Sequence, residues 1–482
     1  HQYKNMSAEE RVKVARELSI PLDEEAAKAA EFYRPAEDSA ELAYLRNQRT
    51  GLGGRIPNRQ VHCSALDIPP ISEFAEFLGD YAEREMSTTM VMVRLLSTLL
   101  KQPELGRYVV PIVPDEARTF GMDGLFKVAG IYSPEGQKYR PVDADSLLPY
   151  REVADGQILQ EGICEVGAMA SFMAAGSAYA VHGLPMIPFY IFYSMFGFQR
   201  VGDMIWSCGD MMCKGFLLGG TAGRTTLNGE GLQHQDGHSH ILASTVPNLR
   251  SYDPAVGFEV AALVREGMHQ MYALQQDVFY YLTLYNENYA MPSLAQIAQQ
   301  TGVTEEEILQ GVIAGGYRFY RGRADTARTV HILASGSIMQ QALLARDALE
   351  NIKIGVCLWS MTSFVELQRD ALACQQYNRE NPQGEPKISR LHKMFKGESG
   401  VFIAVTDYMA ALAQGIAAWM PVGFEVLGTD GYGLSESRPR LREHFAVDAL
   451  AIAEASLSAL YRNGLIEKDE LESAVQGLRR GK

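Results

Sequence analysis

Strand-like and helix-like segments alternate through most of this 482-residue chain, and that alternation constrains the fold more than any other feature. Short apolar strands are predicted within residues 109–119, 184–196 and 202–220. Helical segments separate them, among them a helix rich in small residues within 156–181. Strands separated by helices at this spacing predict an α/β protein built on a parallel sheet.

A second α/β unit is predicted to begin near Arg328. Residues 329–349 have the pattern of a strand, a turn and a helix, and further strands are predicted within 351–364, 401–409 and 424–433. The first part of the chain is polar and helix-rich, with prolines between its helical segments. We therefore expect three domains. These are a helical connector over 1–85, a parallel-sheet domain over 86–300 and a C-terminal α/β domain over 301–482.

The turn formed by Ser335, Gly336 and Ser337 lies between a predicted strand and a predicted helix. Such a turn can cradle a phosphate at the helix N-terminus, or it can simply connect the two elements. The GxGxxG pattern of dinucleotide-binding turns does not occur here, which favours the plain connection. Further along, the polar stretch over residues 375–400 predicts a surface loop.

The composition excludes several classes of protein. A net charge of −14 without a basic block is unfavourable for nucleic-acid binding. The longest uncharged apolar stretch, residues 184–198, contains two prolines and is shorter than the roughly 20 residues that span a bilayer. Six scattered cysteines are typical of reduced thiols in the cytoplasm. Cys208 and Cys213 have no second pair to complete a zinc site. We expect a cytoplasmic protein that binds no nucleic acid, no membrane and no structural metal.

The most unusual segment covers residues 228–240 and reads NGEGLQHQDGHSH. His234, His238 and His240 lie there among glycines, together with Glu230 and Asp236. Histidines at this spacing can converge on a metal ion. Alternatively, they can belong to a turn in which the imidazoles cap backbone groups.

Glu165 lies early in the predicted helix, between Ile163 and Val166. An acid there is favoured by the helix dipole, or it is a buried carboxyl that shares its proton with a ligand nitrogen. Position alone favours the first interpretation. Nearby, aromatic residues predict a buried strand that passes into an aromatic turn, with alternation placing half of the rings in the sheet interior. These rings are Phe189, Tyr190, Phe192, Tyr193, Phe196 and Phe198.

Several sequence blocks together resemble one family. They are EGICEVGA (161–168), IFYSMFGFQR (191–200), GLQHQDGHSH (231–240) and PDEARTFG (114–121). The blocks resemble the homodimeric, bacterial-type E1 components of the pyruvate dehydrogenase complex, and the similarity runs essentially end to end. These E1 components are transketolase-like thiamine diphosphate enzymes. The resemblance implies a transketolase-like α/β fold, with a pyrimidine-binding parallel-sheet domain followed by a C-terminal α/β domain.

The resemblance also implies roles for single residues. Glu165 is expected to bond N1′ of the cofactor's aminopyrimidine from an apolar pocket. Phe196 is expected to stack on that ring, and Tyr193 to face the reaction centre. His234 is expected to point at the substrate carboxylate and to take part in proton transfer, where a group that titrates near neutral pH is useful.

Other residues are placed around this centre by the resemblance. Asp115 and Glu116 are expected close to the thiazolium, and Asp143 at the tip of a loop (134–155) that orders over the bound intermediate. His1 matches a histidine that helps to receive a lipoyl group, while Glu230 and Asp236 orient the imidazoles. His238 and His240 are expected to support the loop or the cofactor. Catalytic roles are thus implied for Glu165, His234, Glu116, Tyr193 and His1, and cofactor contacts for Glu165, Phe196, Asp115, Ile163, His238 and His240.

The GDG motif that holds Mg²⁺ and the diphosphate in thiamine enzymes does not occur in this sequence. We therefore expect the diphosphate-binding domain to be absent, with the Mg²⁺ ligands on a partner domain or subunit. The chain begins at His1 without a methionine. It is expected to be either a fragment of the full enzyme or the natural second subunit of a split one.

The resemblance implies thiamine diphosphate-dependent oxidative decarboxylation of a 2-oxo acid, most simply pyruvate, with acyl transfer to a lipoyl-bearing E2 partner. A homodimer or a heterotetramer is expected, assembled through residues 160–220. Two alternatives stay open. The chain is a subunit of a split-type carboligase or 2-oxobutyrate dehydrogenase, or it is a non-catalytic assembly subunit that kept the fold.

Overall fold

The computed structural model describes residues 5–54, 63–79, 85–114, 117–146, 148–322 and 328–480. The chain forms two compact units, residues 1–61 and residues 62–482. In the first unit, each helix begins after a Ser or Asp whose side chain accepts a hydrogen bond from the first turn, as helix N-caps do. These helices are α1 (Ala8–Glu17), α2 (Glu24–Ala29) and α3 (Ala40–Gly51).

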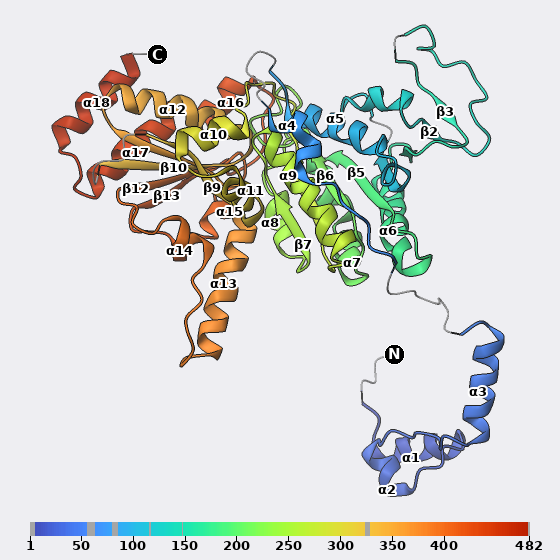
Figure 1. Cartoon of the computed structure of the whole chain (residues 1–482). Helices are drawn as coiled ribbons and strands as arrows, with labels where there is room; N and C mark the ends of the chain where they lie inside the picture. The colour runs from blue at the N-terminus through green and yellow to red at the C-terminus, as the bar shows by residue number, and fades with distance from the viewer. Residues whose placement is uncertain are drawn as a thin grey trace. The chain divides into compact units, whose positions relative to one another are not determined.

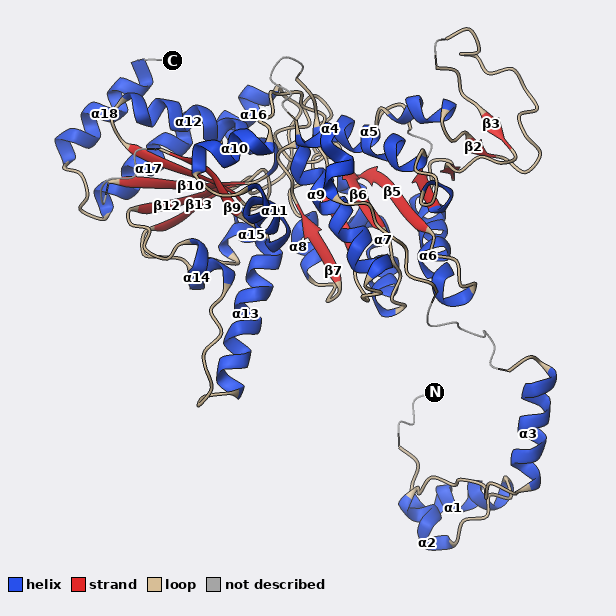
Figure 2. Ribbon diagram, in the orientation of Figure 1, coloured by secondary structure: helices blue, strands red, loops and turns tan. Residues whose placement is uncertain are grey.

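The larger unit contains a six-stranded sheet in the order β4-β1-β5-β6-β8-β7, with every pair of neighbours parallel. This confirms the predicted parallel α/β architecture, which Figures 1 and 2 show beside a second sheet. The strands are β1 (Val109–Val113), β4 (Leu159–Gln160), β5 (Ile187–Tyr193), β6 (Phe216–Gly220), β7 (Leu249–Tyr252) and β8 (Phe279–Thr283).

Helices cover this sheet, as a parallel sheet requires. The small-residue helix α6 packs on β1 and β5, α7 packs on β5 and β6, and α5 packs on α9. Helix α5 begins after Ser87, whose hydroxyl accepts a hydrogen bond from the Met90 backbone N–H, as its sequence predicts. The helices are α4 (Ala75–Leu78), α5 (Thr88–Leu100), α6 (Glu165–Val181), α7 (Ser194–Asp210), α8 (Ser239–Ser244) and α9 (Gly257–Met268).

The central strand β5 is buried on both faces. Phe189, Tyr190 and Phe192 are all inaccessible to solvent, and Phe189 stacks on Phe216 of β6 with ring centroids 4.6 Å apart. Of the six rings, these three are fully buried and the later three are partly buried, but the division follows position along the chain and not alternation between the two faces of the strand. A central parallel strand has helices on both sides, so its inward and outward side chains are both covered.

The second sheet has the order β13-β12-β10-β11-β9. Four of its strands are parallel and lie in the segments where strands were predicted, while β9 pairs antiparallel at one edge. The strands are β9 (Tyr317–Arg321), β10 (Thr329–Ala334), β11 (Gly355–Ser360), β12 (Val401–Val405) and β13 (Phe424–Leu427). The helices around it are α10 (Leu294–Thr301), α11 (Glu305–Ala314), α12 (Met339–Asn351), α13 (Phe364–Glu380), α14 (Arg390–Met394), α15 (Ala410–Gln414), α16 (Arg438–His444), α17 (Ala449–Arg462) and α18 (Lys468–Arg480).

Two local predictions for this region have clear outcomes. The surface loop predicted over 375–400 was wrong at both ends, because α13 continues to Glu380 and α14 (Arg390–Met394) buries Leu391 and Met394. The turn at Ser335–Ser337 is a plain connection from β10 to α12 through a short 3₁₀ turn, and its hydroxyls bond Thr406 and Thr226 of neighbouring segments.

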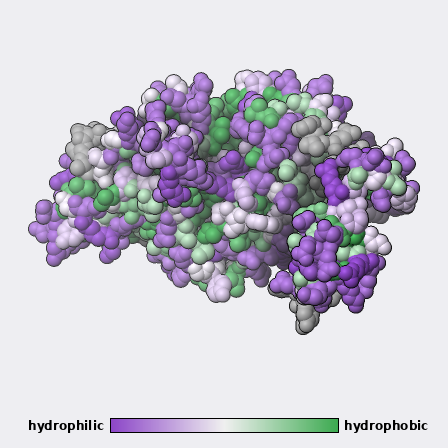
Figure 3. Space-filling view, turned by 90° about the horizontal axis from the view of Figure 1, so that it is seen from below, coloured by the Kyte–Doolittle hydropathy of each residue, from purple (hydrophilic) through white to green (hydrophobic). Residues whose placement is uncertain are grey.

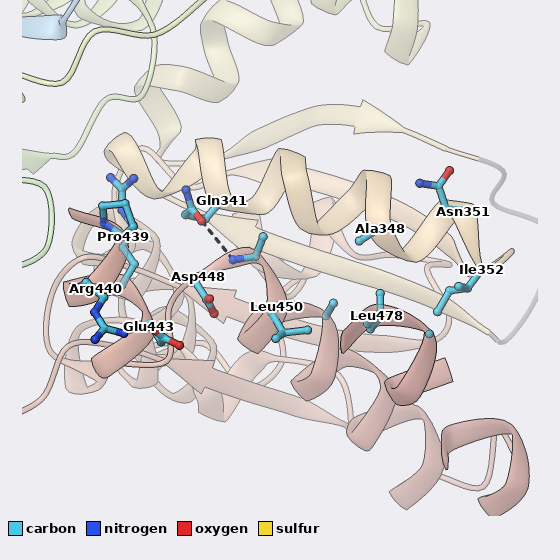
Figure 4. A pocket seen from close by; sticks show the side chains of 14 residues that line it. Gln341, Ala348, Asn351, Ile352, Pro439, Arg440, Glu443, Asp448, Leu450 and Leu478 are labelled. Carbon is cyan, nitrogen blue, oxygen red and sulfur yellow. Dashed lines mark hydrogen bonds and ion pairs between the residues drawn. The ribbon is translucent and has the colours of Figure 1, made fainter. Parts of the chain in front are cut away.

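On the face shown in Figure 3, hydrophilic residues predominate and hydrophobic residues gather in separate patches. Within the described residues, no helix is both long enough and apolar enough to cross a membrane. A cavity of about 590 Å³ opens between α12, α16, α17 and α18, with apolar side chains such as Leu450 and Leu478 beside charged ones (Figure 4). None of the sequence-predicted site residues lines that cavity.

Candidate active site

The candidate residues follow the carboxyl ends of strands in the six-stranded sheet. Glu165 begins α6 after β4, and Tyr193 ends β5 where α7 begins. Strand β6 is followed by residues 221–238, named here the His loop, which lead into α8. Open parallel sheets place their binding crevices at this edge. The predicted residues from three separate sequence blocks therefore meet at one place.

Three rings from two of these blocks form a cluster. The ring centroid of His234 lies 5.1 Å from that of Tyr193 and 5.1 Å from that of Phe196, and the two aromatic rings are 5.6 Å apart. The His234 side chain is 20% exposed, so one side of the cluster opens to solvent. The structure thus brings together the ring predicted to stack on the cofactor and the two groups predicted to face the substrate.

Phe196 lies on a helix, not in the predicted aromatic turn. Helix α7 begins at Ser194, directly after β5, so Phe196 is in its first turn. A residue four positions further along lies on the same helix face, and that residue is Arg200. The Arg200 guanidinium carbon lies 3.9 Å from the centroid of the Phe196 ring.

Glu165 is the first residue of α6, and the Cys164 thiol caps the helix by accepting a hydrogen bond from Gly167 N–H. The Glu165 side chain is only 11% exposed, and its Oε1 accepts a hydrogen bond from Arg200 Nη1 at 2.5 Å. The carboxylate therefore does not lie in a purely apolar pocket, as the resemblance implied. A cation already neutralises its charge, which a partly buried carboxylate requires.

Apolar side chains beside Glu165 face solvent. Ile163 is 75% exposed and Val166 is 55% exposed. On α7, Trp206 is also exposed. Ile163 is thus available for contact with a ligand or another chain. The apolar surface around it coincides with the region predicted to form an interface.

His234 retains unused hydrogen-bonding capacity. Its Nδ1 is buried and has no hydrogen-bond partner among the described residues. Glu230 Oε2 lies 3.4 Å from this nitrogen, but the direction does not make a hydrogen bond. Glu230 was predicted to orient an imidazole, and in the structure it lies near His234 without a hydrogen bond to it.

Asp236 does not orient an imidazole as the resemblance implied. Its carboxylate accepts hydrogen bonds from the backbone N–H groups of His238 and Ser239 and from the Ser239 hydroxyl, so it holds the start of α8. Its nearest imidazole nitrogen, Nδ1 of His238, is 4.0 Å away. His238 instead pairs through Nε2 with the side-chain amide of Gln199 on α7, at 2.5 Å.

His240 is buried and uses both ring nitrogens inside the protein. Nδ1 pairs with the Ser251 hydroxyl at 2.6 Å, and Nε2 pairs with the Thr283 hydroxyl at 2.9 Å. Burial lowers the pKa of His240, so the imidazole is neutral at physiological pH. This geometry favours support of the loop, one of the two expected roles, over contact with a cofactor.

The start of the His loop is anchored on the C-terminal part of the chain. Asp407 follows β12 and is fully buried. Its Oδ1 accepts hydrogen bonds from the Thr225 N–H at 2.8 Å and hydroxyl at 2.6 Å, and its Oδ2 accepts from the Thr226 N–H at 3.0 Å and hydroxyl at 2.6 Å. At Gly223, where φ is +87°, an added Cβ would clash with the same carboxylate. The segment therefore fits closely around Asp407.

The rest of the His loop is anchored in the same way. The Met409 N–H donates to the Gly237 carbonyl at 2.7 Å, and the Leu434 N–H donates to the Gln235 side chain at 2.7 Å. Arg438 Nε donates to the Thr226 carbonyl at 2.5 Å. We call the residues that hold the loop the clamp: Asp407, Met409, Leu434 and Arg438. The position of His234 thus depends on a segment about 200 residues further along the chain.

Some predicted residues cannot be placed. His1, Asp115 and Glu116 lie outside the described residues. Asp143 is described, and its carboxylate accepts hydrogen bonds from the Arg118 side chain and the Tyr150 N–H. The strands β2 (Ile131–Tyr132) and β3 (Glu152–Val153) pair near the base of the loop that carries Asp143.

Sequence reasoning missed three residues at this site. Arg200 belongs to the quoted block IFYSMFGFQR, and a helix beginning at Ser194 would have placed it beside Phe196. Asp407 lies in the predicted strand segment VFIAVTDYM, but its partners are too distant in sequence to be inferred. Thr221, at the end of β6, has a positive φ of 49° and a buried hydroxyl without a partner among the described residues. Such strain is typical of functional sites.

The described part of the chain contains no group of three or more His, Cys, Asp or Glu side chains arranged to hold a metal ion. The three histidines of the His loop have separate partners, as described above. His234 lies in the ring cluster, His238 pairs with Gln199, and His240 lies inside the fold. These positions do not form a common metal site.

Family models match most of the larger unit. The model described as the pyruvate dehydrogenase E1 component middle domain matches residues 66–292, and that of the transketolase-like C-terminal domain matches residues 315–448. Among solved structures, a transketolase mutant from Pichia stipitis has a TM-score of 0.61 at 14% identity and covers 96% of this chain and 61% of its own. The transketolase from Campylobacter jejuni has a TM-score of 0.58 at 15% identity, and the match covers 94% of this chain and 59% of the transketolase. These similarities show the transketolase-like fold.

Curated relatives are more similar in sequence. The pyruvate dehydrogenase E1 component of Pseudomonas aeruginosa is 48% identical over 460 residues, which cover 95% of this chain and 51% of the relative. The E1 component of Escherichia coli K12 is 41% identical over 479 residues, which cover 98% of this chain and 52% of the relative. The chain thus spans about half the length of the curated relatives it matches. From its sequence relatives and its family models, the chain belongs to the family of pyruvate dehydrogenase E1 components, of which it spans about half the length.

Proposed function

We propose that this chain forms the pyrimidine-binding side of a thiamine diphosphate site and contributes to decarboxylation of a 2-oxo acid. Pyruvate is the substrate proposed first. The diphosphate and Mg²⁺ would be held by a further domain or subunit. One observation carries the proposal. Glu165, Phe196, Tyr193 and His234 come from three sequence blocks and converge at the carboxyl edge of one sheet. The names of the relatives support pyruvate as the substrate.

The residues of this chain suit a planar, nitrogen-containing ring. A planar cationic group, the Arg200 guanidinium, already lies against the Phe196 face while bonded to Glu165. The same pair of groups can stack on an aminopyrimidine and bond its ring nitrogen. Because the sequence lacks the GDG motif, the groups that would hold the diphosphate are proposed to lie on the partner domain or subunit.

When bound, thiamine diphosphate supplies a nucleophilic thiazolium carbon and an electron sink for the electrons released with CO₂. The residues of this chain would orient the ring and manage protons. Glu165 would hold a proton at the N1′ position, and Phe196 would fix the ring plane. His234, whose Nδ1 has no hydrogen-bond partner among the described residues, would bond the substrate carboxylate or transfer a proton.

Assembly through the 160–220 region is part of the proposal. Ile163 and Val166 expose apolar surface at the start of α6, next to Glu165, and Trp206 is exposed further along α7. Exposed apolar residues that gather in one area commonly mark protein interfaces. A solved structure titled a split-gene transketolase in an inactive β4 tetramer matches 78% of this chain and 98% of its own, with a TM-score of 0.51. Its title supports a partner subunit as one source of the remaining half.

Acyl transfer to a lipoyl-bearing E2 is the reaction proposed to follow decarboxylation, because the relatives are named as components of pyruvate dehydrogenase. A carboligase or a 2-oxobutyrate dehydrogenase would use the same site with another acceptor or substrate. A non-catalytic assembly role would not require Glu165 and His234 to converge. That convergence supports the catalytic function.

The test is reconstitution. The chain would be combined with the part of the Pseudomonas aeruginosa relative that it does not cover, and CO₂ release from pyruvate would be measured with thiamine diphosphate and Mg²⁺. Glu165→Gln should lower turnover by about 10²-fold or more, as expected for a proton-transfer group. Glu104→Gln, at an exposed acid before β1, is the matched control. Undiminished turnover by Glu165→Gln would reject the catalytic role.

A further inference from the structure

We infer that Arg200 acts as an internal competitor for the aminopyrimidine ring, occupying the ring's two recognition groups until the cofactor displaces it. This inference rests on the proposed function and extends it to a residue with no assigned role. Its basis is that one side chain satisfies both contacts expected of the ring. Arg200 bonds the carboxylate of Glu165 at 2.5 Å and covers the face of Phe196 at 3.9 Å.

The chemical similarity between the two groups is close. A guanidinium is flat, delocalised and cationic, and it presents N–H donors along one edge. An aminopyrimidine protonated at its ring nitrogen is also flat and cationic, with an N–H donor on its edge. Both can stack on an aromatic ring while donating to a carboxylate. Glu165 and Phe196 therefore cannot engage both groups in the same geometry.

The helix explains how Arg200 reaches this position. Phe196 and Arg200 are four residues apart on α7, so their side chains lie on one face. Glu165, from α6, lies across from them. The regular helix is interrupted immediately afterwards at Val201, where φ is −130° and ψ is 22°. The Arg200 position is thus set by its place on α7, four residues from Phe196, and by its hydrogen bond to Glu165 of α6.

Displacement of Arg200 should be easy. Its side chain is 47% exposed, and the contacts found for it among the described residues are those with Glu165 and Phe196. Solvent reaches the guanidinium end of the ion pair and screens it, although Glu165 is mostly buried, and an exposed cation–π contact is weak. A long arginine side chain can swing into solvent without disturbing the core. The closed arrangement nevertheless keeps the carboxylate of Glu165 paired when no ring is present.

Competition of this kind lowers apparent affinity by the fraction of molecules with an open site. The two weak contacts together should favour the closed arrangement by about 5- to 30-fold. Replacing Arg200 with Met keeps the side-chain length and removes the guanidinium. This variant should bind the ring about 5- to 30-fold more tightly than the parent chain.

The test is ligand-observed NMR titration of the whole chain with 4-amino-2,5-dimethylpyrimidine, which lacks a diphosphate. Arg200→Met should bind this probe more tightly, and Arg200→Lys should fall between it and the parent because lysine keeps the charge without the planar face. Arg107→Met is the matched control, since Arg107 also lies over an aromatic ring, that of Tyr108, but outside the site. It should bind like the parent. In parallel, the Arg200 Nε–H signal of ¹⁵N-arginine-labelled protein should shift toward that of a free side chain as the probe is added.

The outcomes separate this inference from the proposed function. Equal or weaker probe binding by Arg200→Met, or an Arg200 signal unchanged at saturation, would overturn the inference and make Arg200 a support for Glu165. Adding Glu165→Gln to Arg200→Met should weaken binding again if the pyrimidine site is correct. Probe binding that is insensitive to Glu165→Gln, or absent from every variant, would contradict the proposed function and remove the basis of the inference.

Discussion

The two sides of the candidate site are held in different ways. The His loop is anchored by the clamp, and its central anchor is a fully buried carboxylate with four donors. The opposite side, at Glu165 and Phe196, is held by Arg200, whose side chain is about half exposed. One side depends on contacts far apart in sequence. The other depends on neighbours within a helix and between adjacent helices.

The difference indicates different tasks. A group that moves protons must be held near its productive geometry before the substrate arrives, and buried hydrogen bonds provide that. A surface that receives a large ring must be able to open, and weakly held, partly exposed side chains provide that. We therefore expect substitutions on the two sides to affect different measurements.

The largest effect is expected from Asp407→Ala. It leaves the buried N–H and hydroxyl groups of Thr225 and Thr226 without their acceptor, and removing one partner from such a buried network typically costs about 3–5 kcal/mol. The free energy of unfolding, measured with urea, should fall by that amount. Asp469→Ala, at an exposed acid on α18, is the control and should change it by less than about 0.5 kcal/mol. A similar small change for Asp407→Ala would show that the clamp does not hold the loop.

His234→Ala should separate chemistry from stability. The imidazole is partly exposed, so its truncation removes little core volume. In the reconstituted enzyme, turnover should fall by about 10²–10⁴-fold, the usual contribution of a general acid–base group. The melting temperature should stay close to that of the parent. Unchanged turnover would reject the catalytic role. If the variant instead lost a stoichiometric transition metal, measured by elemental analysis, the metal-site interpretation of the histidines would be supported.

His240 should make the clamped side sensitive to acid. Burial lowers its pKa below the 6.5 of an unperturbed imidazole, so the unfolded chain takes up a proton at a higher pH than the folded one. Its contribution to stability is therefore complete above about pH 6.5 and declines as the pH falls, by at most about 1.4 kcal/mol per pH unit.

Urea unfolding at pH 7.5 and pH 5.0 checks this prediction. The parent should lose more stability between the two pH values than His240→Gln does. His331 is the comparison, because burial also lowers its pKa and it lies in the second sheet. His331→Gln should remove its own share of the pH dependence. An identical pH dependence in the parent and His240→Gln would show that His240 does not contribute.

The smallest effect on the chain itself is expected from Ile163→Ser, on the exposed side. Ile163 is 75% exposed, so the free energy of unfolding should change by less than about 0.5 kcal/mol. If this surface is an interface, the same substitution should weaken assembly, which light scattering at micromolar concentrations can measure. A monodisperse monomer in the parent would count against assembly through residues 160–220.

The sequence predicted the parallel α/β architecture and the segments of seven strands, because many strands of a parallel sheet produce apolar segments between helices. The grouping of Glu165, Tyr193, Phe196 and His234 was implied by the family resemblance, and the structure places them at or just after strand ends on one edge of the sheet. Strands β4, β7 and β8 of the first sheet were not predicted, and neither was the edge strand β9 of the second. The β9 segment, YRFYR, mixes aromatic and basic residues and lacks the apolar run that marks the buried strands.

The partners of the site residues were harder to predict. The start of α7 at Ser194 was missed because the aromatic run continues from the strand into the helix without a polar cap. That error hid the placement of Arg200 beside Phe196. The clamp was beyond prediction for another reason. Asp407 and Thr225 are about 180 residues apart, and no local pattern connects them.

Calorimetric titration with thiamine diphosphate and Mg²⁺ tests the central claim most directly. It would compare the chain alone, the complementing part of the Pseudomonas aeruginosa relative alone, and the two combined. The account predicts weak or undetectable binding by the chain alone and tight binding by the combination, weakened when Glu165→Gln replaces the parent chain. Tight Mg²⁺-dependent binding by the isolated chain, or binding by the combination that Glu165→Gln leaves unchanged, would contradict it.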